Sequence, residues 1–207
     1  MLAHGYSIEG HNRASVGRYL AGIAAIAATL ATTLLASIGK LMVALGMPSW
    51  AYSYSAIAIS ASLAYGVVYW IFNKYAWKAL SRLWKIPNID GEWKGSGQSM
   101  DDDGTIKFEW SSTIKISQDW EKIYIKQTTE QSASNSVSAA LIPCGDGTYL
   151  LMYSYRNEPR VGEPELQSHL GYCELQFEKD LKSATGEYFT AKGRKSFGRI
   201  SITRAEN

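Results

Sequence analysis

Two long segments without charge constrain this chain more than any other feature. Tyr19 to Ile38 is a run of 20 residues and Trp50 to Phe72 a run of 23 with no charged side chain. As α-helices rising ~1.5 Å per residue they would be about 30 and 34 Å long, enough to cross a hydrocarbon core of roughly 30 Å. The first run is too long, and starts too far into the chain, for a signal peptide. We therefore predict a transmembrane hairpin with spans 19–38 and 50–72.

Basic residues flank these spans and predict their orientation. Residues 1–85 carry seven Lys or Arg and one acidic residue, a net charge of +6, whereas residues 86–207 carry a net charge of −4. The connector 39–49 holds only Lys40, while the other basic residues of the first part precede the first span or follow the second. The positive-inside rule then places both termini in the cytoplasm. The acidic second part also argues against a polymeric nucleic acid as partner.

Small side chains recur every four positions in both predicted spans. They are Ala24, Ala28, Thr32 and Ala36 in the first span and Ala58, Ser62 and Gly66 in the second. Such rows let helices approach closely within a bilayer. The pattern fits packing inside one hairpin and also packing between chains of a homo-oligomer, and both interpretations remain open.

After Lys85 the hydrophobic period changes from helical to alternating, with Pro87 at the transition. Residues 86–207 show short runs of period two separated by turn signals, which predict strands at eight places. These are near 90–98, 105–117, 121–131, 135–142, 148–156, 167–178, 184–190 and 198–204. Short connections favour an eight-stranded antiparallel up-and-down (lipocalin-like) β-barrel, which can hold one ligand at its mouth. A seven- or eight-stranded sandwich is the structural alternative.

We therefore expect two parts, residues 1–85 with the N-terminus and the transmembrane hairpin, and residues 86–207 as a ligand-sensing β-barrel. The second part has one histidine, His169, and the cysteines Cys144 and Cys173 lie far from any metal-ligand spacing. It has no nucleophile elbow, phosphate-binding loop or dinucleotide fingerprint. The acidic run Asp101–Asp103 is typical of a polar turn. We expect no catalytic residues, no metal site and no cofactor, so the chain is not expected to be an enzyme.

Binding is the chemistry that remains. Arginine side chains near predicted strand ends, such as Arg156 and Arg199, match the geometry of phosphate groups. Aromatic rings such as Trp93, Tyr155 and Tyr188 can stack on bases. Taken alone, an arginine on a loop is usually solvated and a tyrosine on a strand usually packs, so these residues do not identify the ligand.

The order of parts resembles a known family. Two spans and a basic connector lead into Ile86-Pro87-Asn88-Ile89-Asp90-Gly91-Glu92-Trp93, and the chain closes with Gly186-Glu187-Tyr188-Phe189-Thr190, then Arg194 through Gly198 and Ile200-Ser201-Ile202. In this order the chain is similar to the two-transmembrane β-barrel effectors of bacterial CBASS, a cyclic-oligonucleotide anti-phage defence system. The resemblance extends over nearly the whole sequence.

The resemblance implies a function. The barrel would bind a cyclic dinucleotide made by a CBASS nucleotidyltransferase, which would drive homo-oligomerisation, disruption of the bacterial inner membrane and abortive infection. The protein would then be a multi-pass inner-membrane protein with its β-barrel in the cytoplasm. The resemblance leaves the bases of the ligand and the oligomer size undetermined.

A cyclic dinucleotide offers two phosphates and two bases, so it needs cationic contacts and stacking faces. Our candidates for the phosphates are Arg156, Arg194 and Arg199, and our candidates for the bases are Trp93, Tyr155 and Tyr188. Two other functions stay open at this point. One is a membrane-tethered lipocalin-like carrier of an apolar ligand, and the other is a structural membrane adaptor with a filled barrel.

Overall fold

The computed structural model describes residues 3–10, 12–48, 61–81, 86–162, 167–191 and 196–206. The chain divides into two compact units. One is the helical unit Asn12–Trp77, and the other, the sheet unit, combines Met1–His11 with Lys78–Asn207. The sheet unit is therefore assembled from both ends of the chain.

The helical unit begins with α1, Arg13–Ala44, whose first turn is capped by Asn12. The Asn12 side chain accepts a hydrogen bond from the Ser15 N–H at 3.2 Å. At 32 residues α1 is about 48 Å long. Within the described ranges, α1 is the one helix long and apolar enough to cross a membrane.

The helix α1 is longer than the predicted span 19–38. It starts before Arg18 and continues past Lys40, so the predicted connector 39–49 is helical as far as Ala44. A run without charge marks the part of a helix that matches the hydrocarbon core. The helix itself continues where Lys and Arg side chains reach the membrane interface.

The second predicted span is described only from residue 61, and residues 49–60 lie outside the described part. Its described portion is α3, Ala61–Ile71, followed by a π-helical turn, η1, at Phe72–Ala76, and by α4 at Trp77–Leu80. Helices α1 and α3 pack against each other. Ala24 and Ala28 of the first small-residue row are buried, whereas Ser62 and Gly66 of the second row are exposed. In this unit the first row packs within the hairpin, whereas Ser62 and Gly66 do not; Ala58 of the second row lies outside the described residues.

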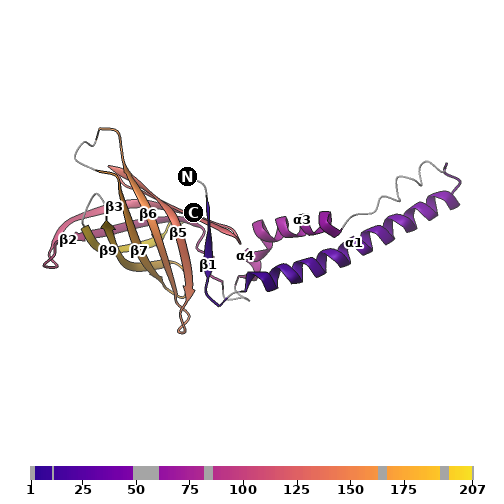
Figure 1. The fold of residues 1–207 in the computed structure, drawn as a ribbon, viewed down its shortest axis with the longest axis horizontal. Helices are drawn as coiled ribbons and strands as arrows, with labels where there is room; N and C mark the ends of the chain where they lie inside the picture. The colour runs from indigo at the N-terminus through magenta and orange to yellow at the C-terminus, as the bar shows by residue number, and fades with distance from the viewer. Residues whose placement is uncertain are drawn as a thin grey trace. The chain divides into compact units, whose positions relative to one another are not determined.

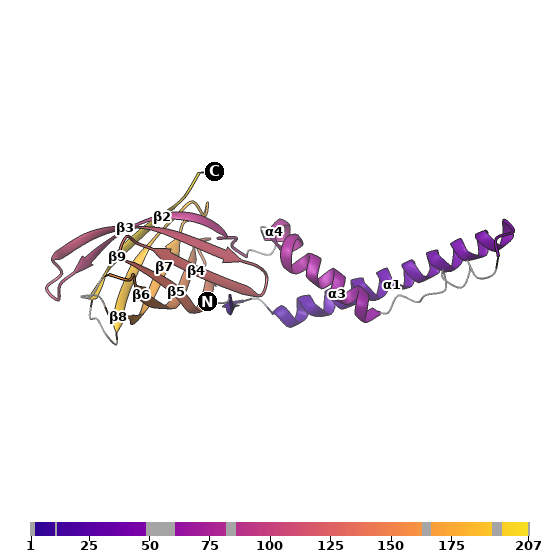
Figure 2. The same cartoon turned by 90° about the horizontal axis from the view of Figure 1, so that it is seen from above.

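Nine strands form the described part of the sheet unit, and each of the eight predicted strands has its counterpart among them. Their bounds are β1 His4–Ile8, β2 Gly91–Met100, β3 Ile106–Gln118, β4 Lys122–Thr128, β5 Ser132–Pro143, β6 Tyr149–Pro159, β7 His169–Phe177, β8 Ser183–Ala191 and β9 Ser196–Arg204. They make one closed, ring-like sheet in the order β1-β4-β3-β2-β9-β8-β7-β6-β5 (Figures 1 and 2). Because the ring is closed, the sandwich alternative is wrong.

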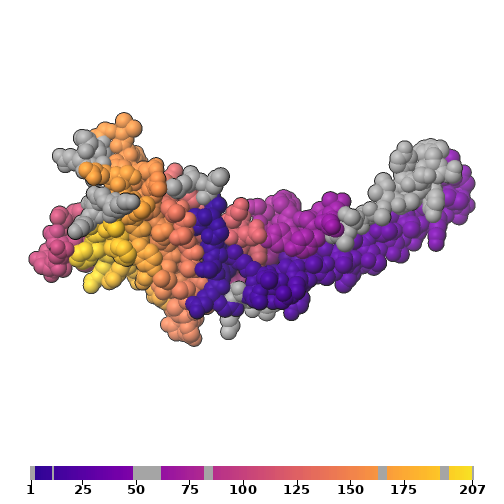
Figure 3. All heavy atoms as spheres, viewed as in Figure 1, coloured from indigo at the N-terminus to yellow at the C-terminus, as the bar shows by residue number. Residues whose placement is uncertain are grey.

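The ninth strand, β1, corrects the prediction of eight. The sequence predicts no strand at residues 4–8, which it places in the N-terminal segment before the hairpin, because five residues are too few to show a convincing alternation. In the structure β1 pairs antiparallel with β4, from His4 opposite Ile123, and parallel with β5, from Tyr6 opposite Ala139. Figure 3 shows this N-terminal segment, in indigo, lying alongside the residues of β5. The parallel pair means that the ring is not purely antiparallel.

The strand β1 fills a gap between β4 and β5. These two strands pair directly only over Lys126–Thr128 with Ala133–Asn135, and further along they separate. At the fork the Ser136 hydroxyl accepts the Ile125 N–H at 2.9 Å and lies 2.7 Å from His4 Nε2. The register of β5 shifts at the same place, between Ser136 and Ser138. Without β1, both separated strands would expose an unpaired edge.

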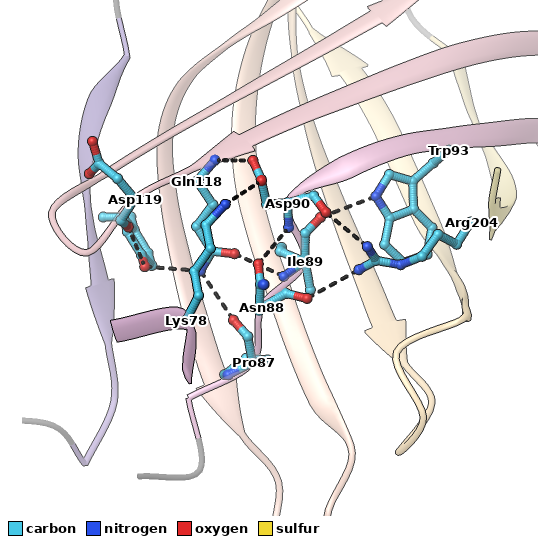
Figure 4. Close-up of polar contacts among 10 residues, drawn as sticks. Lys78, Pro87, Asn88, Ile89, Asp90, Trp93, Gln118, Asp119 and Arg204 are labelled. Atoms are coloured by element: carbon cyan, nitrogen blue, oxygen red, sulfur yellow. Dashed lines mark hydrogen bonds and ion pairs between the residues drawn. The ribbon is translucent and has the colours of Figure 1, made fainter. Parts of the chain in front are cut away.

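Gln118 joins the two places where the chain enters the ring (Figure 4). Its side-chain amide donates to Tyr6 Oη of β1 at 3.0 Å and to the Pro87 carbonyl at 3.1 Å. Its carbonyl oxygen accepts the Ile89 N–H at 2.9 Å. Every one of these bonds is buried. One side chain thus holds the strand that precedes the helical unit and the segment that follows it.

Asp90 and Arg204 add further polar contacts at the place where the chain enters the ring after the helical unit. Asp90 accepts the Gln118 backbone N–H at 2.9 Å and forms an ion pair with Lys78 at 2.7 Å. The Arg204 guanidinium donates to the carbonyls of Asp90 and Asn88, and lies 4.5 Å from the centre of the Trp93 ring. Its partial burial lowers the pKa of Arg204, and the nearby Asp90 charge opposes that shift.

Replacing Gln118 by Ala should destabilise the sheet unit by about 3 kcal/mol, because the buried Ile89 N–H and Pro87 carbonyl lose their partner. Urea unfolding of the detergent-solubilised full chain, followed by tryptophan fluorescence, measures the change. The control is Gln167→Ala, at an exposed position, which should stay within about 0.5 kcal/mol of the parent. Equal stability of the two variants would contradict the role of Gln118.

Candidate functional site

The interior of the ring has a packed half and a hollow half. In the packed half, apolar side chains from every strand of β2–β9 are buried. These side chains are Trp93, Ile114, Ile116, Ile123, Ile125, Leu141, Leu151, Leu175, Phe177, Ala184 and Ile202. Gln118 lies on β3 next to this half. Burial of this apolar surface stabilises the ring without leaving room for a ligand.

The hollow half lies towards the other ends of the same strands. It is a cavity of about 1270 Å³ that is open to solvent. Its interior-facing lining is mostly hydroxyl, amide and aromatic side chains. These include Ser99, Phe108, Trp110, Gln127, Ser132, Ser134, Tyr155, Asn157, His169, Tyr188, Thr190 and Ser196. This lining suits a ligand that carries both flat rings and many hydrogen-bonding atoms.

Two aromatic rings in this lining lie flat against a neighbouring strand. Trp110 of β3 is opposite Gly97 of β2, and Tyr155 of β6 is opposite Gly171 of β7. A Cβ atom at either glycine would overlap the ring opposite it. Glycine therefore keeps each ring close to the wall of the cavity and the lumen open.

The polar groups of the cavity are ordered by hydrogen bonds. Asn157 donates to the hydroxyls of Ser132 and Ser134, at 3.0 and 2.9 Å. On the opposite side the Tyr188 hydroxyl contacts Ser99 and accepts the Trp110 indole N–H at 3.2 Å. Fixed donors and acceptors of this kind favour a ligand with a defined pattern of polar atoms.

Charge is confined to the exposed part of the described lining. Its charged residues are Glu109, Glu130, Glu187 and Arg199, and all four are exposed. Arg199 lies in register between Gln98 and Glu187. Within the described residues the inner wall is thus neutral, and no three His, Cys, Asp or Glu side chains form a group that could hold a metal ion.

Cys173 is the one thiol in the described lining, and it is buried. Burial raises the pKa of Cys173 to about 12, and the Glu174 charge adds to this shift. A thiol with this pKa stays protonated near neutral pH and is a poor nucleophile. We therefore interpret Cys173 as a packing residue of the cavity wall.

The structure brings two of the six sequence candidates into the cavity, Tyr155 and Tyr188. Arg199 lies at its exposed border, on the outward face of β9, because the adjacent Gly198 and Ile200 are the buried, inward positions. Trp93 is fully buried in the packed half, with its ring edge against Phe177. Arg156 is exposed between the two cavity residues Tyr155 and Asn157, but it does not line the cavity. Arg194 lies outside the described residues.

Sequence analysis did not select Trp110, Asn157 or Gln127 as site residues. Trp110 belongs to the predicted strand 105–117, where it is in phase with the core residue Ile114. Nothing in that pattern distinguishes a residue of the packed half from one of the hollow half. The Gly97 opposite Trp110 is the feature that separates them, and it requires the strand register.

At pH 8, iodoacetamide should label Cys144, which is half-buried, and leave Cys173 unmodified in the folded chain. Peptide mass spectrometry of the detergent-solubilised protein measures the two sites. In urea both cysteines should react, which controls for reagent access. Rapid labelling of Cys173 in the folded state would contradict its raised pKa.

Comparison with known proteins follows the division into two units. Residues 84–204 match a family described as Cap15, cyclic dinucleotide receptor domain, and residues 14–78 match one described as Cap15, TM helices. The chain is also 36% identical over 214 aligned positions to CD-NTase-associated protein 15 from Yersinia aleksiciae, with all of both chains covered. The first match contains nearly all strands of the ring and its cavity, and the second contains α1 and α3.

Proposed function

Because the chain belongs to the Cap15 family of CBASS effectors, membrane proteins with a cyclic dinucleotide receptor domain, we propose that the cavity of the ring is the receptor site. The observation that carries this proposal is the division of the interior into a packed half and a hollow half of about 1270 Å³. That volume exceeds the roughly 300 Å³ of a small ligand pocket and suits a ligand with two bases and two phosphates.

The chemistry of the lining supports the same ligand. Tyr155 and Tyr188 supply rings near the bases, as the sequence suggested, and hydroxyls and amides supply neutral partners for bases and phosphates. Arg199, at the exposed border of the cavity and on the outward face of β9, stays our sequence candidate for a phosphate contact. Arg194 stays a candidate from the sequence. Trp93, buried in the packed half, would support the ring instead of touching the ligand.

Arg199→Ala should weaken binding of a cyclic dinucleotide by about 10- to 100-fold, because a charge-assisted hydrogen bond contributes about 1.5–3 kcal/mol. Calorimetry on the full chain in detergent measures the affinity. Arg156→Ala is the matched control, since it removes the same charge from an exposed residue that does not line the cavity. Equal losses in the two variants would indicate a general charge effect, and unchanged affinity in Arg199→Ala would remove this contact.

The sheet also supports the proposed topology. β1 precedes α1 in the chain and β2 follows the second helical segment, yet both belong to one hydrogen-bonded ring. A sheet does not continue through a bilayer as an open structure, because its backbone groups need partners. Both ends of the helical unit therefore lead to one side of the membrane, and the excess of basic residues there favours the cytoplasm, behind a bacterial inner membrane.

We propose that ligand binding makes copies of the chain associate through the membrane helices and disrupt the bilayer, which ends in abortive infection. Ser62 and Gly66 of α3 support this step, since both are exposed and a Cβ at Gly66 would meet no described atom within 4 Å. Small residues four positions apart allow close helix packing in lipid. Binding can shift association only if the ligand favours the associated form.

Replacing Ser62 and Gly66 together by Leu should abolish ligand-induced association and cell killing while leaving ligand affinity within about twofold, because neither residue lies in the cavity. Cross-linking in membranes measures association, and colony counts measure killing. Val67→Leu, on an exposed position of the same helix, is the control and should behave as the parent. Persistent killing by the double variant would show that this face is not used.

The carrier of an apolar ligand finds less support. Its cavity would need an apolar lining, but here the apolar interior is filled and the open half combines aromatic rings with Ser, Thr, Asn and Gln side chains. Where a lipocalin-like carrier would bind an apolar ligand, this ring is filled by its own apolar side chains. Thermal stabilisation of the full chain by a fatty acid, and not by any cyclic dinucleotide, would reverse this preference.

A further inference from the structure

We infer that Trp110 is the stacking platform for one base of the ligand, held in place by Gly97 behind its ring and by Tyr188 at its edge. The inference rests on the proposed function, because it assigns a role inside the same cavity. It concerns a residue that the sequence pattern placed among ordinary strand positions, and it gives Tyr188 a positioning role in place of direct stacking.

The first observation is the position of the ring. Trp110 lines the cavity and is only half-buried, although it points to the interior of the ring of strands. One face of its indole lies against the backbone of β2 at Gly97, where a Cβ atom would overlap the six-membered ring. With that face covered by the wall, the other face is the one available to a ligand.

The second observation is that the indole edge is already occupied. Its N–H donates to Tyr188 Oη at 3.2 Å, and that oxygen also contacts the Ser99 hydroxyl. The Tyr188 ring stands edge-on to Trp110, with 5.6 Å between ring centres. These contacts fix the plane of the indole, so little conformational entropy is lost when a base stacks on it.

The arrangement determines what kind of recognition takes place here. Since the only polar group of the indole is used within the protein, Trp110 offers the ligand a face and no hydrogen bond. Every base has a π-face, so stacking on Trp110 is tolerant of base identity. Discrimination between bases is then the task of the amides across the cavity, such as Asn157 and Gln127.

Tyr155 has a similar glycine-backed position, but it is a weaker candidate for the same role. Only 7% of Tyr155 is exposed, and its ring packs near Tyr153 and His169. Trp110 is the more open of the two rings and has the larger surface.

The test uses the full chain in detergent and four symmetric cyclic dinucleotides, carrying adenine, guanine, uracil or cytosine. Trp110→Ala should weaken every dinucleotide that binds by about 5- to 100-fold, as the loss of one base–aromatic stack implies. The order of affinities across the four should stay the same. Trp110→Tyr, which retains an aromatic face, should lose less than Trp110→Ala.

Gly97→Ala tests the position of the platform. It should weaken binding about as much as Trp110→Ala, because its methyl group displaces the indole. Thr113→Ala, at an exposed position of β3 that does not line the cavity, is the control and should bind as the parent does. Equal affinities for Gly97→Ala and Thr113→Ala would overturn the inference.

Tyr188→Phe tests the positioning role. It removes the acceptor of the indole N–H, so we expect a few-fold weaker binding together with a smaller ligand-induced change of tryptophan fluorescence. That fluorescence change should be absent in Trp110→Phe. If the parent binds a cyclic dinucleotide and Trp110→Ala binds it equally well, this inference fails and the receptor function stands. If the parent binds none of the four, the proposed function itself fails.

Discussion

The sheet unit depends on the backbone pairing of five residues that precede the first membrane helix. β4 and β5 separate beyond Lys126–Thr128, and β1 supplies the missing partner to both. Ser136 and Gln118 fix the two ends of this insertion, one at the fork and one at the entrance of the chain. Closure removes the exposed edges that would otherwise make an all-β domain prone to association with other sheets. The remaining features of the ring follow from this closure, since only a closed wall can enclose a cavity.

The interior shows how one sheet meets two opposing requirements. Bulky side chains fill one half, and a close-packed core of this kind gives the ring its stability. In the other half, the ring stays open because glycines let aromatic side chains lie flat and because the inward residues are short and polar. A receptor site needs such pre-ordered polar groups, and a stable domain needs the opposite. Placing the two at opposite ends of the same strands satisfies both.

Much of the fold could be predicted from the sequence, because its signals are local. A run without charge predicts a span, and alternation with intervening turns predicted all eight strands of the region after Lys85. β1 was not predicted, because its pairing depends on residues far away in sequence and a five-residue strand carries little pattern of its own. The candidate site was harder for the same reason. Tyr155 and Tyr188 were chosen for their chemistry and do line the cavity, whereas Trp93 and Trp110 are indistinguishable until the register shows which half of the interior each occupies.

The place of β1 in the chain also has a consequence for biosynthesis. β1 leaves the ribosome first, but its partners follow much later, and His4 meets Ser136 across a separation of 132 positions. The pairing of β1 with β4 and β5 can therefore form only after both helical segments have been made. A nascent chain has no finished cavity while its helices are being inserted, so it cannot respond to a messenger already present in the cell. Closure of the ring, and with it the cavity, is therefore a late step in the synthesis of this chain.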